Sequence, residues 1–429
     1  MTKQPKSTLT VFDSAQTSRQ LGVFPEGKLI YWLLGIILLI YAGLALNGYG
    51  NHDDIYRMIG TWRSLLSEQR YVSSRFQGYL VPELVIGAAS HVGSFYLSNL
   101  VSVGLAIGSL YIFYRLLTQI TAPLTAVLAT AVVGSNPFWI IPSVTSTDYV
   151  YPAFFFMLGV FLLLQQRFRW AGLLFALAVS SRLTYGPMGA IALTFYFPYL
   201  RQHPSLRGRY FQGWLLFLLG SAALYSPVFF ASGMTFSFLG FASDTSGGTL
   251  GVVARFIYKN LYLWGLPAFI VLLFCLIRER DFFWRKIRAN PFRTVTAPQL
   301  VFLAVLTGFL YSEFLFARLP HQYQYLIPVL FCVAYFIALI PNQTRQIIYL
   351  SLIVLLHCTY AVVNLDIIDT YQTGEVNQTI HSDGAVVKVS LKEGVLVRDF
   401  RWRSIYQRRL TEEFNQRWQH FGAPLDNPR

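Results

Sequence analysis

Two adjacent carboxylates, Asp53 and Asp54, follow the first apolar segment of the chain. A carboxylate at a membrane surface is partly desolvated, which moves its pKa toward the range of a general base. The alternative is structural, because an acidic side chain also caps a helix and favours its first turn. These acids are therefore candidates to take a proton from a hydroxyl group, and the sequence alone does not say which of them does so.

Two arginines and a third acid stand in polar segments between apolar runs. Arg75 precedes Glu83, Asp148 lies in a turn rich in Ser and Thr, and Arg182 ends an apolar run. A guanidinium holds a phosphate through paired hydrogen bonds, and a cation buried in a membrane needs a partner. Arg75 and Arg182 are therefore candidates to hold a phosphate, and an outer carboxylate is another possible partner for Arg182. The alternatives are a snorkelling side chain for Arg75 and an ordinary turn residue for Asp148.

A last polar cluster stands between two late apolar runs. It is rich in hydrogen-bond donors and acceptors, which suits contact with a polar headgroup. The alternative is a belt of satisfied polar residues at the membrane surface. The cluster consists of Glu313, Arg318, His321, Gln322, Tyr323, Gln324 and Tyr325.

The composition indicates a membrane protein. Of 429 residues, 54% are hydrophobic and 13% are charged, against about 25% charged in soluble domains. These values exclude a soluble globular enzyme and a disordered chain. The net charge of +14 does not indicate nucleic acid, because no basic run is interleaved with aromatic residues. The three cysteines lie in apolar runs, and the absence of CxxC and HExxH motifs argues against a dedicated zinc site.

The hydropathy pattern predicts an all-α fold, a polytopic transmembrane helical bundle of about eleven spans. A span needs about 20 largely apolar residues, and a shorter one thins the bilayer or ends near a cavity. Residues 1–28 precede the first span, which we interpret as an uncleaved anchor. The predicted spans are 29–46, 95–117, 122–141, 150–166, 170–186, 187–200, 211–232, 260–278, 298–314, 325–340 and 346–363.

The distribution of Lys and Arg predicts the orientation. Most of those before residue 364 lie in segments on the same side as the N-terminus, which places 1–28 in the cytoplasm. An odd number of spans then places the tail, 364–429, outside the cytoplasm. The candidate carboxylates lie on this outer side, and none lies in the middle of a span.

Three units follow from this arrangement: the N-terminal segment, a membrane module over 29–363, and the tail. The outer loop 47–94 is predicted to hold two interfacial helices, an amphipathic one over 55–66 and an apolar one over 79–90. In the tail, alternation over 385–397 predicts two strands around a Glu-Gly turn, and 404–420 is predicted to be helical. The tail is therefore expected to be a small α+β domain.

The motifs resemble those of the GT-C class of integral-membrane glycosyltransferases, which includes protein O-mannosyltransferases and lipid A aminoarabinose transferases. Residues 53–56 (Asp-Asp-Ile-Tyr) are similar to the acidic motif of the first outer loop, which is commonly Asp-Glu, and Asp148 matches an acid in the next one. Residues 182–187 resemble a basic residue followed by a small-residue and proline turn. Residues 321–328 resemble a signature before a late span, although Gln324 stands at its usual basic position.

The resemblance implies transfer of a sugar from a polyprenyl-phosphate donor to a glycan, lipid or protein acceptor outside the cytoplasm. Asp53, Asp54 and Asp148 would be catalytic, and Arg182 and Arg75 would hold the departing phosphate. One base and in-line attack predict inversion at the anomeric carbon. No cofactor or metal is predicted, although the three acids could hold a divalent cation. The residues expected to contact substrates are Tyr56, Glu83, Glu313, His321, Gln322 and Tyr325.

Two other classes of protein fit the same composition. A transporter or lipid flippase would show repeated halves, or broken spans with ionisable groups at the membrane midplane. A non-catalytic membrane subunit would not need its outer carboxylates.

Overall fold

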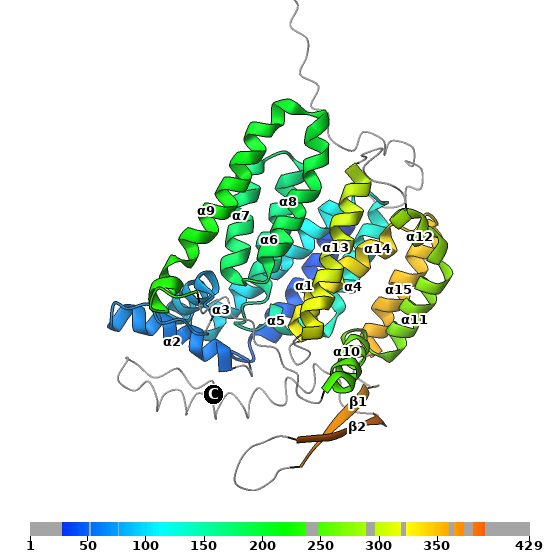
Figure 1. The fold of residues 1–429 in the computed structure, drawn as a ribbon. Coiled ribbons are helices and arrows are strands. Elements are labelled where there is room, and N and C mark those ends of the chain that lie inside the picture. The colour runs from blue at the N-terminus through cyan, green and yellow to red at the C-terminus, as the bar shows by residue number, and fades with distance from the viewer. Residues whose placement is uncertain are drawn as a thin grey trace, which may run out of the picture.

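A computed structural model of the chain describes eight segments. These are residues 28–50, 53–75, 77–236, 248–288, 297–318, 323–359, 364–372 and 381–390. The helices form one bundle, and a two-stranded sheet lies at one end of it (Figure 1).

The first three helices include both predicted spans and predicted interfacial segments. They are α1 (Lys28–Ala45), α2 (Asp53–Ser67) and α3 (Leu80–Leu117). The amphipathic helix predicted for 55–66 is confirmed as α2, which buries Ile55, Met58 and Ile59 on one face. The backbone of α3 leaves helical geometry at Gly93 and Ser94, so the predicted segment 79–90 and the predicted span 95–117 are the two arms of one kinked helix.

The middle of the chain forms a broken helix and a compact group of shorter helices. A bend of 69° separates α4 (Pro123–Ser135) from α5 (Pro137–Ser143). Close packing follows from two glycines, because a Cβ on Gly172 would lie 2.1 Å from the carbonyl oxygen of Gly213 on a neighbouring helix. The helices that follow are α6 (Val150–Leu164), α7 (Phe168–Ser181), α8 (Tyr185–Gln202), the short η1 (Pro204–Leu206) and α9 (Arg207–Ala231).

The last part of the bundle packs on α8 through α13. Helix α13 packs against both α8 and α14, and α15 packs against α4 and α11. The elements are α10 (Gly248–Trp264), α11 (Leu266–Arg278), α12 (Arg280–Arg288), α13 (Ala297–Arg318), η3 (Tyr323–Leu326), α14 (Ile327–Ala338) and α15 (Gln343–Thr359).

Most predicted spans coincide with one helix or part of one, whereas 122–141 covers α4 and most of α5, 260–278 covers the end of α10 and all of α11, and 170–186 runs past α7 into the start of α8. Among the described segments, four helices are long and apolar enough to cross a membrane, or five if α4 and α5 form one bent span. Others, including α6, α7 and α14, are apolar but shorter. The chain is therefore an integral membrane protein with an all-helical membrane part. The shortness of α6, α7 and α14 has a structural reason, because each begins or ends at the polar site described below.

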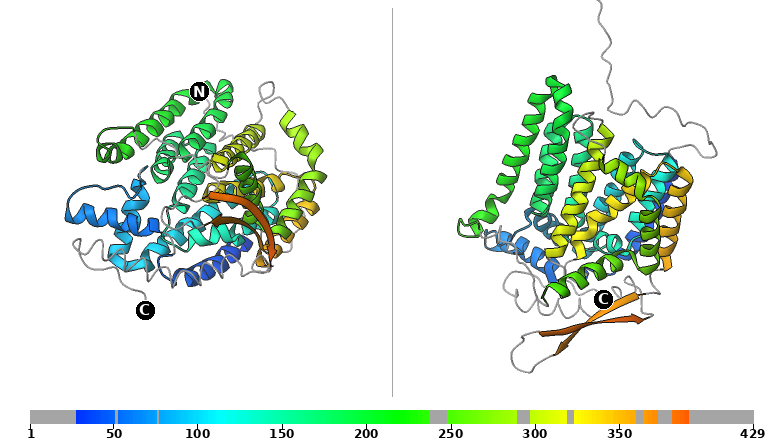
Figure 2. Two further views of the ribbon diagram at one scale, coloured as in Figure 1. Left: turned by 60° about the horizontal axis from the view of Figure 1, so that its bottom comes forward. Right: turned by 45° about the vertical axis from the view of Figure 1, so that its right-hand side comes forward.

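The two ends of the bundle differ in character. Helix α2 and the hairpin lie at one end, and α12 and the turn between α8 and α9 lie at the other (Figures 1 and 2). The second end is rich in cations, with three basic residues in the last turn of α12 alone.

The hairpin differs from its prediction. Strand β2 (His381–Ser390) pairs antiparallel with β1 (Asn364–Gln372), which the sequence analysis did not predict as a strand. The alternation of polar and apolar residues placed a strand at 385–390 correctly, but it did not identify the partner. The predicted turn, the helix 404–420 and residues 1–27 lie outside the described residues.

Candidate active site

A buried ion pair joins two of the predicted site residues. Arg182 Nε lies 2.9 Å from Asp148 Oδ2, and the two side chains are only 4% and 1% exposed. Arg182 follows the last residue of α7, and Asp148 lies just before α6. The pair is incompletely satisfied, because Asp148 Oδ1 and Arg182 Nη2 have no hydrogen-bond partner among the described residues. Unpaired buried polar atoms cost free energy, so these two atoms mark a place where a polar ligand would be stabilised.

Three tyrosine rings surround the Arg182 guanidinium. Its central carbon lies 4.1 Å from the ring centroid of Tyr149, 5.5 Å from that of Tyr79 and 5.6 Å from that of Tyr325. A cation over an aromatic face is stabilised by about 0.5–2 kcal/mol per contact. The three rings therefore hold a cation in an apolar membrane protein and fix its position.

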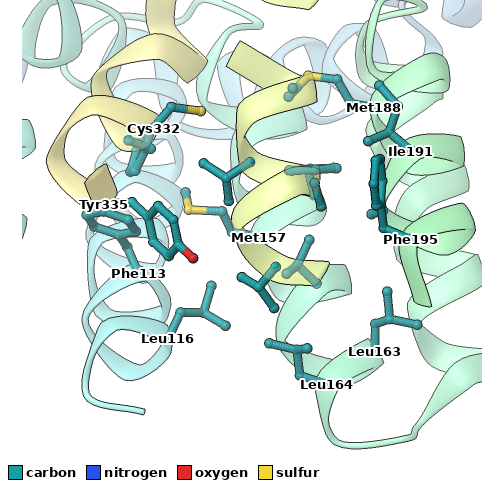
Figure 3. A pocket seen from close by; sticks show the side chains of 18 of the residues that line it. Phe113, Leu116, Met157, Leu163, Leu164, Met188, Ile191, Phe195, Cys332 and Tyr335 are labelled. Atoms are coloured by element: carbon teal, nitrogen blue, oxygen red, sulfur yellow. The ribbon is translucent and has the colours of Figure 1, made fainter. Parts of the chain in front are cut away.

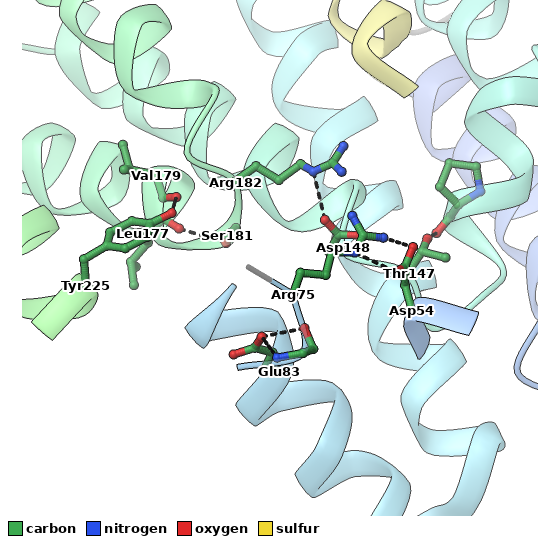
Figure 4. Close-up of polar contacts among 12 residues, drawn as sticks. Asp54, Arg75, Glu83, Thr147, Asp148, Leu177, Val179, Ser181, Arg182 and Tyr225 are labelled. Carbon is green, nitrogen blue, oxygen red and sulfur yellow. Dashed lines mark hydrogen bonds and ion pairs between the residues drawn. The ribbon is translucent and has the colours of Figure 1, made fainter. Parts of the chain in front are cut away.

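A second ion pair lies beside the first. Arg75 Nε donates to Asp54 Oδ1 at 2.7 Å, and a second contact joins Arg75 Nη2 to Asp54 Oδ2. Burial lowers the pKa of Arg75, but the negative charge of Asp148 and the neighbouring Tyr149 and Tyr79 together raise it by more, so the net pKa lies above its ordinary value. Figure 4 shows Arg182, Asp148, Arg75 and Asp54 next to one another. The loop between α1 and α3 and the two later polar turns therefore meet at one site.

Glu83 anchors the loop that carries Arg75. Its Oε1 accepts from the backbone N and the hydroxyl of Ser74 at 2.9 and 2.5 Å, and its Oε2 accepts from the Tyr71 hydroxyl at 2.5 Å. Burial raises the pKa of Tyr71, and the negative charge of Glu83 raises it further, which keeps this donor protonated. Both carboxylate oxygens of Glu83 are thus used by the chain itself, which ties α3 to the loop and positions Arg75.

Asn99 on α3 fixes the turn that carries Asp148. Its Nδ2 donates to the carbonyls of Ala45 and Gly48 at 2.9 and 2.7 Å, and its Oδ1 accepts from Ser146 Oγ at 2.7 Å. One buried amide therefore connects the end of α1 with the turn that precedes α6.

The end of α7 is held by a neighbouring helix. The hydroxyl of Tyr225 on α9 donates to the carbonyl of Val179 at 3.0 Å. Since Val179 lies in the last turn of α7, this contact fixes the position from which Arg182 extends (Figure 4).

Two neighbouring spaces share part of their lining near Arg182. The smaller pocket is lined by Arg182, Ser312, Gln324, Thr184 and tyrosine rings. Tyr185, Met188 and Pro328 line both this pocket and a long apolar cavity (Figure 3).

The apolar cavity runs along α8 toward the far end of the bundle. It is lined at successive positions of this helix, from Tyr185 to Tyr199, which corresponds to about 21 Å at 1.5 Å per residue. Its other walls come from α3, α6, α13 and α14, and they are almost entirely apolar. The space can therefore take a hydrocarbon chain whose polar end lies at Arg182.

The remaining predicted residues lie at different distances from this site. Tyr325 joins it, whereas Tyr56 is buried in the core with its ring edge-on to Tyr49. Glu313 accepts from Asn260 Nδ2 at 3.0 Å and so connects α13 with α10. His321, Gln322 and the side chain of Asp53 lie outside the described residues. Among the side chains that are described, no group of three His, Cys, Asp or Glu residues is placed to hold a metal ion.

The sequence interpretation missed three contributors to the site. Tyr149 directly follows Asp148, and Tyr79 closes the segment that contains Arg75, so both were adjacent to residues already singled out. Asn99 had no such signal, because a single amide in an apolar helix gives no indication of its partners.

Comparisons with known proteins identify the fold. No protein-family model matches the chain, and no curated protein sequence matches it. A crystal structure of ArnT from Cupriavidus metallidurans bound to undecaprenyl phosphate is similar, with a TM-score of 0.54 and 15% identity. The match covers 75% of this chain and 62% of ArnT, so the chain corresponds to less than two thirds of the length of ArnT.

A second solved structure also matches. It is the arabinosyltransferase EmbB from Mycobacterium smegmatis, with a TM-score of 0.41 and 15% identity, over 96% of this chain and 41% of EmbB. Both proteins are GT-C glycosyltransferases. Taken with the motifs of the outer loops, the ArnT match shows that this chain shares the fold of the GT-C membrane glycosyltransferases.

Proposed function

We propose that the protein is a membrane glycosyltransferase that moves a sugar from a polyprenyl-phosphate donor to an acceptor outside the cytoplasm. The observation that carries this proposal is the incompletely satisfied pair of Arg182 and Asp148 at the end of a long apolar cavity. A lipid phosphate would match both features, because its anion would contact Arg182 and its hydrocarbon chain would lie in the cavity.

The donor would lie with its chain in the apolar cavity and its phosphate at Arg182. Arg75 would provide the second cation, since both guanidinium groups lie within 5.5 Å of the Tyr79 ring centroid. Two cations stabilise the charge that develops on the phosphate as it leaves. The undecaprenyl phosphate bound to ArnT, which has the same fold, supports this class of donor.

The transfer itself requires a base. The acceptor hydroxyl oxygen would form a bond to the anomeric carbon while the bond from that carbon to the phosphate oxygen breaks, and the phosphate would leave with the electron pair. Asp53 or Asp54 would take the hydroxyl proton, and Asp148 would orient the acceptor or the sugar. With a single displacement, the anomeric configuration inverts. The glycan, lipid or protein acceptor would approach from the end of the bundle where α2 lies.

The same end of the bundle would face away from the cytoplasm. The cations of α12 and of the turn between α8 and α9 lie at the opposite end, which is the arrangement expected for a cytoplasmic N-terminus and about eleven spans. Residues 29–363 would then form the catalytic module, and 364–429 would form an extracytoplasmic tail.

A polyprenyl-lipid flippase is the second candidate, and one observation favours it. The break between α4 and α5 resembles the broken spans of transporters. Against it, Arg182 and Asp148 lie at the ends of helices and not within them.

Transfer of a labelled sugar separates these candidates. Membranes that contain the protein would be incubated with radiolabelled polyprenyl-phosphate sugars, and transfer to endogenous acceptors would be measured. We expect transfer by the wild type and a loss of at least 100-fold in the Asp53→Asn, Asp54→Asn double variant. Asp281→Asn, an exposed acid on α12, is the matched control. Undiminished transfer by the double variant would remove the proposed base, and movement of lipid without sugar transfer would favour the flippase.

The role of Arg182 is tested separately. Arg182→Ala leaves Asp148 buried and unpaired, which costs about 3–5 kcal/mol. The Arg182→Gln, Asp148→Asn double variant avoids this cost, because both groups become neutral together. Both variants should insert into the membrane and require a higher donor concentration for half-maximal transfer. Unchanged donor kinetics in the double variant would contradict the phosphate role.

A further inference from the structure

The small pocket beside Arg182 contains a buried amide without a hydrogen-bond partner. Gln324 lies on η3 and is 8% exposed. Its Oε1 has no partner among the described residues. The side chain lines the pocket that also contains Arg182. An acceptor left unpaired in a buried site costs free energy unless a ligand supplies a donor.

Other buried amides of the chain show how unusual this is. Gln346 is equally buried, yet its Oε1 accepts from Thr125 at 2.9 Å and its Nε2 donates to the carbonyls of Ala338 and Ile340 at 2.8 and 2.6 Å. Asn99 and Asn136 are also bonded on both sides of their amides. Gln324 therefore differs from the amides that only stabilise the fold.

The other walls of the pocket suit a sugar ring. Tyr149, Tyr185 and Tyr325 supply aromatic surface, which packs against the C–H groups of a pyranose or furanose. Thr184 and Ser312 supply hydroxyl groups. The hydroxyl of Ser312 already donates to the carbonyl of Gly308 at 3.0 Å, which leaves its oxygen as an acceptor. The pocket thus presents acceptors to a ligand that donates.

The charge of the pocket limits which donor fits. The charged side chain that lines it is the cation Arg182, and no carboxylate appears among its described lining residues. A phosphodiester has only acceptor oxygens, so it cannot pair with the free Oε1 of Gln324. An ammonium group could also donate, because Asp148, which contacts Arg182, balances the charge of that cation. Hydroxyl and amino groups of a sugar are therefore the donors that fit.

We propose that Gln324 accepts a hydrogen bond from a hydroxyl or amino group of the transferred sugar. This inference rests on the proposed function, because it places the sugar of the lipid-phosphate donor in the small pocket. Gln324 is in this view a specificity-determining residue, and Arg182 beside it binds the phosphate to which the sugar is attached.

The test compares lipids that differ only in the group attached to the phosphate. The purified full-length protein is titrated with undecaprenyl phosphate alone and with undecaprenyl phosphate that carries glucose or glucosamine. Gln324→Met should weaken the glucose lipid about 10-fold and leave the sugar-free lipid unchanged. Gln324→Glu should shift the ratio of affinities toward the glucosamine lipid, because a carboxylate pairs with an ammonium group.

Each outcome has a distinct meaning. Gln346→Met is the matched control, and it should lower thermal stability without changing the ratio of affinities for the glucose and sugar-free lipids. An equal loss for both lipids in Gln324→Met, or no loss for either, would overturn the sugar contact while the proposed function stands. A wild type that binds none of the three lipids would overturn the proposed function itself.

Discussion

The buried pair of Arg182 and Asp148 neutralises its own charges before any substrate arrives. Two groups that are 4% and 1% exposed would each be costly alone. Together they are tolerated, and the tyrosine rings around Arg182 contribute further stabilisation. In the proposed function, an incoming phosphate would therefore compete with Asp148 for the guanidinium.

This competition predicts opposite effects on binding and on transfer. Asp148→Asn removes the competing charge and keeps the shape of the side chain. We expect undecaprenyl phosphate to bind the variant about 10-fold more tightly or better, while sugar transfer falls. Isothermal titration and the transfer assay measure the two quantities. Weaker lipid binding by the variant would show that Asp148 does not compete with the phosphate.

Asn99 is predicted to position Asp148 and not to touch substrate. Asn99→Leu leaves two carbonyls and the Ser146 hydroxyl without their partner, which we expect to cost about 2–4 kcal/mol and to lower the rate of transfer more than the affinity for donor. Ser109→Ala is the control, because Ser109 only donates to Leu105 on the same helix. Thermal unfolding and donor titration check both expectations. A wild-type rate in a stably folded Asn99→Leu protein would exclude the positioning role.

The helices of the bundle were largely predictable from the sequence, and the site was predictable only in part. Apolar runs mark helices because a buried backbone in lipid must satisfy its hydrogen bonds internally. The meeting of Arg182 with Asp148 also followed from their common placement between spans. The grouping of three tyrosine rings around Arg182 did not follow from the sequence. Tyr79, Tyr149 and Tyr325 come from distant segments, and single tyrosines are common at membrane surfaces. Similarly, alternation predicted β2 but could not identify β1, since pairing is decided by tertiary structure.

Helix α13 forms part of the wall of the apolar cavity. We therefore predict that the rate of transfer depends on the length of the donor's lipid chain. Ala304 lines the cavity one turn from Gly308, on the side away from Arg182. A phenylalanine at 304 would fill the cavity at that depth. We therefore expect Ala304→Phe to use short-chain polyprenyl-phosphate donors normally and long-chain donors at least 10-fold less well. Transfer rates with donors of two and eleven isoprene units measure this.

The control for this change lies on the same helix. Leu310 is 57% exposed and does not line the cavity, so Leu310→Phe should leave both rates unchanged. Equal rates with short and long donors in Ala304→Phe would mean that the chain does not enter the cavity.

The molecule as a whole has two chemically distinct ends, and this predicts its orientation in the membrane. Glu68 at the end of α2 and Arg280 on α12 lie at opposite ends of the bundle, and both are exposed. In a protein without its natural cysteines, Glu68→Cys should react with a membrane-impermeant thiol reagent in intact cells. Arg280→Cys should react only after the membrane is opened. The reverse pattern would place the site on the cytoplasmic side.

The apolar cavity also affects how a substrate would reach the protein. A donor held by its hydrocarbon chain never leaves the bilayer, so it arrives by lateral diffusion in two dimensions. For such a substrate, the encounter rate follows its mole fraction among the surrounding lipids and not its amount per volume of buffer. Diluting the same quantity of donor with additional phospholipid would therefore slow the reaction, although every bulk concentration in the tube stays constant.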